Sequence, residues 1–202
     1  MIVQSKPGRK TLVLTDFDGT ITRGDTLSRY LLFAVPVHRL IAGLAASVFR
    51  ISVMLLRRRY TTENAKEAVL ASFLKGEAER LLRMKGEQFC RKKLPGMLRD
   101  SVCSKLKTLH DNGASVVIVT ASPDIWVLPY AQSEGYALIS TRLQFLEGRF
   151  TGRLAVPNCR GQEKANRIVT SILLEEFDHI IAIGNSEGDR EMLALAHEAI
   201  MV

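Results

Sequence analysis

The sequence predicts an α/β protein with a Rossmann-like parallel sheet, helices on both faces of the sheet, and an inserted α-helical cap domain. Apolar runs typical of buried strands alternate with amphipathic helical patterns in the second half of the chain. A block rich in Leu, Arg, Glu and Ala, without strand periodicity, separates them from the first strand. With 202 residues, 47% of them hydrophobic, the chain can bury a sizeable core. We expect residues 1–22 and 95–202 to form the α/β core and residues 23–94 the cap.

Three segments are predicted as parallel strands. The β-rich run Lys10 to Phe17 ends in an acidic turn. Ala114 to Thr120 and His179 to Ile183 are continuous apolar runs, which is typical of strands covered on both faces. Glu198 to Val202 is a candidate start of another strand.

The segments around these strands predict a hairpin and two helices. Residues 137–145 and 149–156 flank Glu147-Gly148, which predicts an antiparallel hairpin beside the sheet. Apolar stripes with helical spacing run from Leu98 to Leu109 and from Ala165 to Leu173. Helices of this length between strands are expected to cover the sheet.

The formal charge of +7 and a pI near 9.5 favour an anionic partner. Nucleic acid, phosphorylated metabolites and anionic lipid headgroups would all qualify. No nucleic-acid motif is visible and only 6% of the residues are aromatic, so we expect no nucleic-acid partner. The three cysteines form no C-x-x-C pair and no signal peptide is visible, which predicts a cytoplasmic protein whose mature chain begins near Met1.

The segment Tyr30 to Leu56 is apolar nearly throughout. Arg39 and Arg50 interrupt it, Pro36 is expected to kink it, and its longest uncharged run is roughly half of what a spanning helix needs. We predict a buried helical hairpin with a solvated basic end. The alternative is a helix lying on an anionic membrane surface, because Arg57-Arg58-Arg59 follows directly.

The chemistry is predicted to lie in the sequence Asp16-Phe17-Asp18-Gly19-Thr20. Alternate residues leaving the end of a strand place Asp16 and Asp18 at the carboxyl edge of the sheet, where open α/β folds bind ligands. Two acids so close can divide their roles. One stays ionised on a metal as a nucleophile, and the other holds a proton for a leaving group.

Three more polar elements are predicted at the same edge of the sheet: Thr120-Ala121-Ser122, Lys164, and Gly184 to Asp189. Ser122 and Pro123 are expected to open a helix as its N-cap and first helical residue. A hydroxyl and backbone N–H groups would then converge where an anion binds. Each element alone has a structural explanation, but four in order make coincidence improbable.

With these four motifs, DFDGT, TAS, Lys164 and GNSEGD, the chain resembles the haloacid dehalogenase superfamily over nearly its whole length. The resemblance is to the phosphoserine-phosphatase-like branch, which has a helical cap after the first motif. It implies a phosphomonoester hydrolase that works through an aspartyl-phosphate. Asp16 would attack phosphorus, and Asp18 would protonate the leaving oxygen and later activate water.

The resemblance also implies Mg²⁺ as cofactor. The ion would be held by the Asp16 carboxylate, the Asp18 main-chain carbonyl and Asn185, with Asp189 orienting the metal shell. The phosphoryl oxygens would be held by four groups: Thr120, the backbone amides of Ala121 and Ser122, and Lys164.

Three departures from the family pattern stand out. Asn185 replaces the more usual Asp, so we expect weaker metal binding. Asp25 stands where phosphoserine phosphatases usually have a Glu that contacts the substrate ammonium, and it is equally expected as the N-cap of the first cap helix. Relatives usually continue for a further strand and helix beyond the point corresponding to Val202, so either the core is trimmed or the sequence is incomplete.

Two substrate classes stay open. The family resemblance favours a small phosphomonoester such as phosphoserine. The apolar cap and the context of Asp25 look more like a sister group that includes bacterial phosphatidylglycerophosphate phosphatases, which predicts a lipid phosphate headgroup and peripheral membrane contact through the cap. A non-catalytic phosphate- or anion-binding protein is the alternative from another class, motivated by the positive charge and by Asn185. No oligomeric state is predicted.

Overall fold

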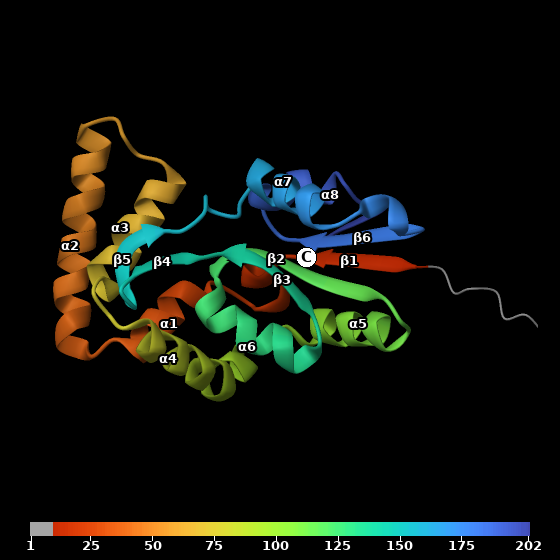
Figure 1. The fold of residues 1–202 in the computed structure, drawn as a ribbon, viewed down its shortest axis with the longest axis horizontal. Helices are drawn as coiled ribbons and strands as arrows, with labels where there is room; N and C mark the ends of the chain where they lie inside the picture. Colours follow the sequence, from red (N-terminus) through yellow and green to blue (C-terminus); the bar gives the residue numbers. More distant parts are fainter. Residues whose placement is uncertain (1–9) are drawn as a thin grey trace, which may run out of the picture.

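The computed structural model describes residues 10–202. Its centre is a parallel five-stranded sheet in the order β3-β2-β1-β6-β7 (Figure 1). The strands are β1 (Thr11–Thr15), β2 (Ser115–Pro123), β3 (Ala137–Thr141), β6 (His179–Gly184) and β7 (Glu198–Met201). The predicted α/β fold class is confirmed.

Helices cover both faces of this sheet (Figure 1). One face carries α5 (Asp100–Asp111) and α6 (Asp124–Glu134), and the other carries α7 (Gln162–Ser171) and the short α8 (Arg190–Leu193). Alternate residues of β1 therefore enter different cores: Val13 packs in one, and Leu12 and Leu14 in the other. Burial on both faces explains why these strands are continuous apolar runs.

Four helices lie between β1 and α5 in the sequence and are called the cap helices below. They are α1 (Thr26–Ala34), α2 (Val37–Leu56), α3 (Thr62–Leu74) and α4 (Glu79–Lys92). Short 3-10 turns occur at Leu94–Met97, Leu174–Glu176 and Glu187–Asp189.

The predicted hairpin is only partly correct. Residues 137–141 form β3 of the parallel sheet, because the chain returns through α6 and so runs alongside β2. The antiparallel pair is the shorter β4 (Leu143–Leu146) and β5 (Arg149–Leu154). Its turn has positive φ at Glu147 and Gly148, as the sequence suggested.

The predicted helix start at Ser122 is wrong. Strand β2 continues to Pro123, which is itself the N-cap of α6, and the first helical residue is Asp124. The register of β2 shifts between Thr120 and Pro123, so the chain stays extended through Ser122. The hydroxyl of Ser122 is thereby free to bond elsewhere.

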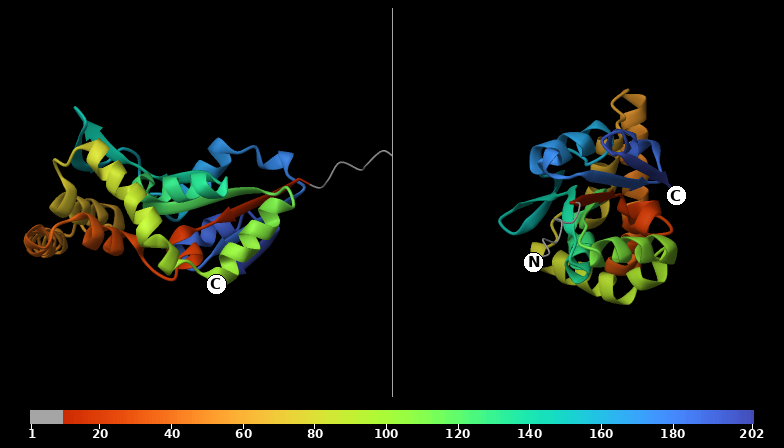
Figure 2. Two further views of the ribbon diagram at one scale, coloured as in Figure 1. Left: turned by 90° about the horizontal axis from the view of Figure 1, so that it is seen from below. Right: turned by 90° about the vertical axis from the view of Figure 1, so that its right-hand side faces the viewer.

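The predicted burial of Tyr30 to Leu56 is confirmed in α1, where Tyr30, Leu31 and Ala34 are buried, and is wrong for α2. Pro36 does not kink one helix but separates α1 from α2. Helix α2 lies at the outer edge of the molecule, seen end-on in the left view of Figure 2. Only Gly43 and Ser47 of α2 are buried. A Cβ on Gly43 would lie 2.4 Å from Cδ1 of Phe73, so α2 packs closely on α3 along this narrow line, while most of its large apolar side chains are exposed.

By length and composition, α2 is the one helix among residues 10–202 that could cross a membrane.

Candidate active site

The polar motifs meet at the carboxyl edge of the sheet because β2, β1 and β6 are adjacent parallel strands. Asp16 follows β1, and Asn185 follows β6. Between them Gly19 has a φ of +78°, and a Cβ there would lie 2.1 Å from Nδ2 of Asn185. The glycine in the first motif is therefore required both for the turn and for the close approach of Asn185.

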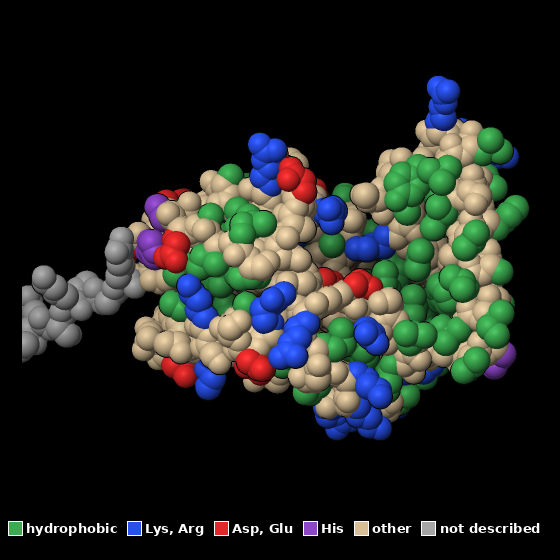
Figure 3. All heavy atoms as spheres, turned by 180° about the vertical axis from the view of Figure 1, so that it is seen from behind, with side chains coloured by type: hydrophobic (Ala, Val, Ile, Leu, Met, Phe, Trp, Pro, Cys, Tyr) green, Lys and Arg blue, Asp and Glu red, His purple; other side chains and the backbone are tan. Residues whose placement is uncertain are grey.

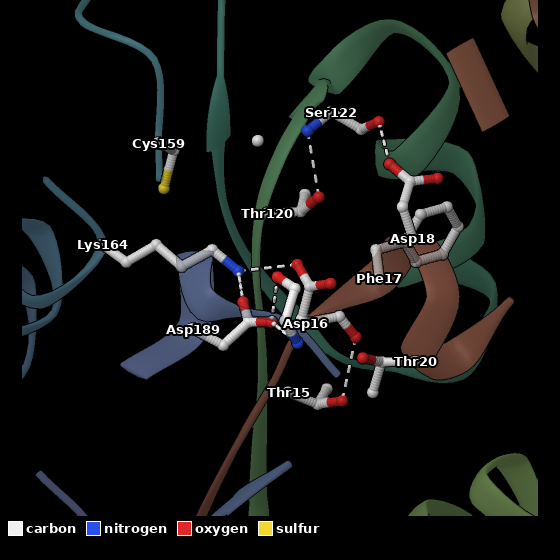
Figure 4. Close-up of polar contacts among 12 residues, drawn as sticks. Thr15, Asp16, Phe17, Asp18, Thr20, Thr120, Ser122, Cys159, Lys164 and Asp189 are labelled. Atoms are coloured by element: carbon white, nitrogen blue, oxygen red, sulfur yellow. Dashed lines mark hydrogen bonds and ion pairs between the residues drawn. The ribbon is translucent and has the colours of Figure 1, made fainter. Parts of the chain in front are cut away.

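Lys164 lies between two carboxylates (Figure 4). Its Nζ donates to Oδ1 of Asp16 and to Oδ1 of Asp189, each at 2.6 Å, and all three side chains are buried. The other oxygen of Asp189 accepts hydrogen bonds from the backbone N–H groups of Asn185 and Ser186 and from the Ser186 hydroxyl. Asp189 thus fixes both the lysine and the loop after β6.

Burial raises the pKa of Asp16 to about 6, although Lys164 opposes this effect. Burial alone would lower the pKa of Lys164, but Asp16 and Asp189 together raise it, so the lysine stays charged. The pKa of Asp189 is lowered, because Lys164 and the hydrogen bonds from Ser186 and Asn185 outweigh its burial. Lys164 therefore stays positively charged and Asp189 negatively charged, whereas Asp16, with its raised pKa, changes its protonation state near pH 6.

Asp18 is turned away from this group, toward α1 and β2. Its Oδ1 accepts a hydrogen bond from the backbone N–H of Thr26 at 2.7 Å, and its Oδ2 accepts one from the Ser122 hydroxyl. Burial raises the pKa of Asp18 while these hydrogen bonds partly lower it. The two acids of the motif therefore have separate surroundings, as two different roles require.

Thr120, Ala121 and Ser122 lie beside the acids, all three within β2 rather than at a helix N-terminus as predicted. The backbone N–H of Ser122 donates to Oγ1 of Thr120 at 3.0 Å, so this amide is already engaged. Asp25 caps α1, accepting hydrogen bonds from the backbone N–H groups of Leu27 and Ser28. It also borders the cavity described next.

A cavity of about 490 Å³ opens at this edge. It is lined by every predicted site residue. Four cationic side chains that were not predicted also line it: Arg23, Lys66, Arg99 and Arg160. Figure 3 shows charged side chains in the hollow between the core and the cap helices.

Lys66 reaches the cavity from α3. Its Nζ donates to the carbonyl oxygen of Ala121 at 2.8 Å and to Oδ1 of Asn158 at 2.9 Å, and burial lowers its pKa to about 8. No local motif marks Lys66 in the sequence, because only the folding of α3 back over the sheet edge brings it here.

The groups present are compatible with a hard divalent cation. Within residues 10–202 no cluster of three or more His, Cys, Asp or Glu side chains is arranged to hold a metal. Oxygen donors are nevertheless available, since no described residue donates to Oδ2 of Asp16, and the Asn185 amide oxygen accepts only from Thr20 at 3.3 Å. An all-oxygen donor set with one carboxylate suits Mg²⁺, which keeps several waters.

Comparison with known proteins agrees with this geometry. The family model for haloacid dehalogenase-like hydrolases matches residues 13–194. The chain belongs to the haloacid dehalogenase-like hydrolases. Protein CicA of Caulobacter vibrioides is 35% identical over 195 residues, which cover 93% of this chain and 83% of CicA. The chain is thus a haloacid dehalogenase-like enzyme, which favours a catalytic protein over an anion-binding one.

Solved structures share the fold. A protein of unknown function from Bordetella pertussis superimposes with a TM-score of 0.74 and 22% identity, covering 96% of this chain and 90% of that one. A substrate-bound phosphoserine phosphatase superimposes with a TM-score of 0.67 and 17% identity, covering 97% and 87%. At these identities the likeness concerns the fold, including the phosphoserine-phosphatase-like arrangement of sheet and helices.

Proposed function

We propose that this haloacid dehalogenase-like enzyme is a Mg²⁺-dependent phosphomonoester hydrolase. The observation that carries the proposal is the buried Asp16–Lys164–Asp189 group next to a second, separately bonded acid, Asp18. A cationic lysine between two carboxylates keeps Asp16 oriented and makes the cavity attractive to an anion. Helices α1–α4, within residues 23–94, would serve as a cap over this edge.

In the proposed reaction an oxygen of Asp16 attacks phosphorus while the alcohol oxygen leaves, forming an aspartyl-phosphate. Asp18, whose pKa is raised by burial, donates its proton to that leaving oxygen. It then takes a proton from water, which hydrolyses the intermediate and releases phosphate. Lys164, the Thr120 hydroxyl and the backbone amide of Ala121 would hold the phosphoryl oxygens, whereas the amide of Ser122 already donates to Thr120.

Asp16, the Asp18 carbonyl and Asn185 would hold Mg²⁺, with Asp189 positioning their loop, and the ion would neutralise charge between the nucleophile and the phosphate. Asn185 supplies no charge, so we expect weaker metal binding than an aspartate would give. A magnesium titration of the wild type beside Asn185→Asp tests this point, and half-activation of the wild type in the low micromolar range would contradict it.

Two substrate classes fit the proposal. The phosphoserine-phosphatase-like fold supports a small soluble phosphomonoester, with Asp25 available for a cationic substituent. A second cavity supports a lipid phosphomonoester. It shares Arg23, Gly24 and Asp25 with the first, and it continues along Leu32 and Phe33. We place the enzyme in the cytoplasm, with peripheral membrane contact if the lipid substrate is correct.

Phosphate release from a substrate panel, with and without Mg²⁺, tests the proposal. The panel contains phosphoserine, other small phosphomonoesters, and phosphatidylglycerophosphate in vesicles. We expect Asp16→Asn to lower kcat by about 10⁴-fold or more, because it removes the nucleophile. Unchanged turnover in this variant would contradict the mechanism. If the wild type binds anions but turns over no substrate of the panel, an anion-binding protein would be favoured.

A further inference from the structure

Helix α2 presents an apolar face that no described part of the chain covers. Seven large apolar residues on it are between 57% and 85% exposed: Val37, Ile41, Leu44, Val48, Phe49, Leu55 and Leu56. Figure 3 shows these apolar side chains along the outer edge of the molecule. We infer that this face docks on the surface of an anionic lipid bilayer. The inference concerns binding and does not depend on the proposed reaction.

The exposed residues lie on one side of the helix. Val37, Ile41, Leu44 and Val48 recur at intervals of three or four residues, which keeps them on the same side. Gly43 and Ser47, the two buried residues, face α3 instead. The apolar face therefore points outward, and α2 can place it in a lipid interface while remaining packed on α3.

The charges around this face match phospholipid headgroups. Residues 37–60 contain five arginines and no Asp or Glu: Arg39, Arg50, Arg57, Arg58 and Arg59. Arg39, Arg50 and Arg57 share one side of the helix, and because each follows a residue of the apolar face by two positions, that side is nearly opposite the face. All five are exposed. Arg57, Arg58 and Arg59 follow directly on the end of the apolar face. A basic cluster next to an apolar helical face is an arrangement that binds anionic bilayers, and each such arginine strengthens binding about fivefold.

The same charges argue against a second copy of the chain as the occupant. Two α2 helices placed face to face would put ten arginines on one helix pair, and this segment has no acidic residue to pair with them. Arg39 has a carboxylate partner in Glu77, but that partner lies between α3 and α4 of the same chain. The other four arginines form no ion pair among residues 10–202.

Sedimentation with vesicles tests the inference, using the full chain. We expect binding to vesicles of equal parts phosphatidylcholine and phosphatidylglycerol, and little binding to phosphatidylcholine alone. The double variant Ile41→Asp/Val48→Asp should lower the partition coefficient by at least about tenfold, because it removes apolar area and adds negative charge. Leu173→Asp is the matched control, since Leu173 is 61% exposed on the core, and it should bind like the wild type.

A charge-reversal variant and two further readouts complete the test. Arg57→Glu/Arg58→Glu/Arg59→Glu should weaken binding by about 100-fold or more and reduce its salt dependence. Circular dichroism and cooperative thermal unfolding report that each variant is folded, and Asp16→Asn should bind vesicles normally even if it is inactive. Equal binding to both vesicle types, or unchanged binding of the double variant, would overturn the inference. So would a dimer in solution that the double variant abolishes, because the face would then bind a second copy.

Discussion

Strand β2 and helix α2 have similarly apolar sequences but opposite surroundings. Strand β2 lies between β1 and β3, with helices on both faces, and its Ile118 is 0% exposed. Helix α2 is covered along one narrow line by α3, and its Ile41 is 69% exposed. A run of apolar residues therefore indicates that burial of the segment is favourable. It does not indicate whether the segment is buried by the protein itself or by something else. Four changes would break or sharpen this comparison.

The largest effect is expected at the end of the core strands. Replacing Lys164 by Met leaves Asp16 and Asp189 buried without their shared cation, so we expect the free energy of unfolding to fall by about 3 to 5 kcal/mol at neutral pH. Chemical denaturation measures this change. Lys107→Met is the control, because Lys107 makes only an exposed ion pair, and it should change stability by less than about 0.5 kcal/mol. Equal effects of the two substitutions would contradict the conclusion that Asp16 and Asp189 depend on Lys164 for their stability in the fold.

In β2 itself, Ile118→Ala is expected to destabilise the fold by about 2 to 4 kcal/mol. Ile118 is fully buried in the sheet, so its truncation loses apolar burial and leaves a cavity. The midpoint of thermal unfolding should fall accordingly. A loss below about 1 kcal/mol would mean that this part of the core is looser than the structure shows.

The raised pKa of Asp16 should be visible in the pH dependence of stability without metal. An aspartate in the unfolded chain has a pKa near 4, and burial raises that of Asp16 to about 6 in the fold, so the folded state holds the extra proton. Stability from this group is therefore full below about pH 4 and is lost as the pH rises to about 6. Compared with Asp16→Asn in the presence of EDTA, the wild type should lose about 1 to 3 kcal/mol across this range.

A flat difference between these two proteins would show that Asp16 has an ordinary pKa. Added Mg²⁺ should shift the loss to lower pH, because a cation favours the ionised carboxylate.

The smallest effect is expected at Ile41. Ile41→Ala removes an exposed side chain and improves helix propensity, so stability should change by less than about 0.5 kcal/mol. The same denaturation experiment as for Ile118→Ala measures it. A loss comparable to that at Ile118 would mean that α2 is covered in solution by a second protein surface, and the contrast between the two segments would disappear.

Much of the core was predictable from the sequence, because its signals are local. The parallel strands appear as apolar runs, and the site residues follow the strand ends in order, so Asp16, Asp18, Thr120, Lys164 and Asn185 could be placed at one edge. Together, the four motifs match one superfamily, and this match distinguished them from ordinary polar residues at strand ends. Their assigned roles remain proposals.

The errors have a common cause in tertiary contacts. Ser122 has the sequence context of a helix N-cap, but its hydroxyl bonds to Asp18, which lies 104 residues earlier. Residues 137–141 look like half of a hairpin, yet β2 offers them a parallel partner. Lys66 lies in the cavity only because α3 packs over the sheet edge, and no pattern within α3 contains that information.

Thr26 connects α1, the first cap helix, to Asp18 of the core. It is the first residue of α1, its backbone N–H bonds to Asp18, and its hydroxyl accepts a hydrogen bond from the indole of Trp126 on α6. The Asp18–Thr26 hydrogen bond therefore couples the protonation of Asp18 to the position of α1. By thermodynamic reciprocity, protonation of Asp18 loosens the start of α1, and any ligand that holds α1 against the sheet lowers the pKa of Asp18 by the same free energy.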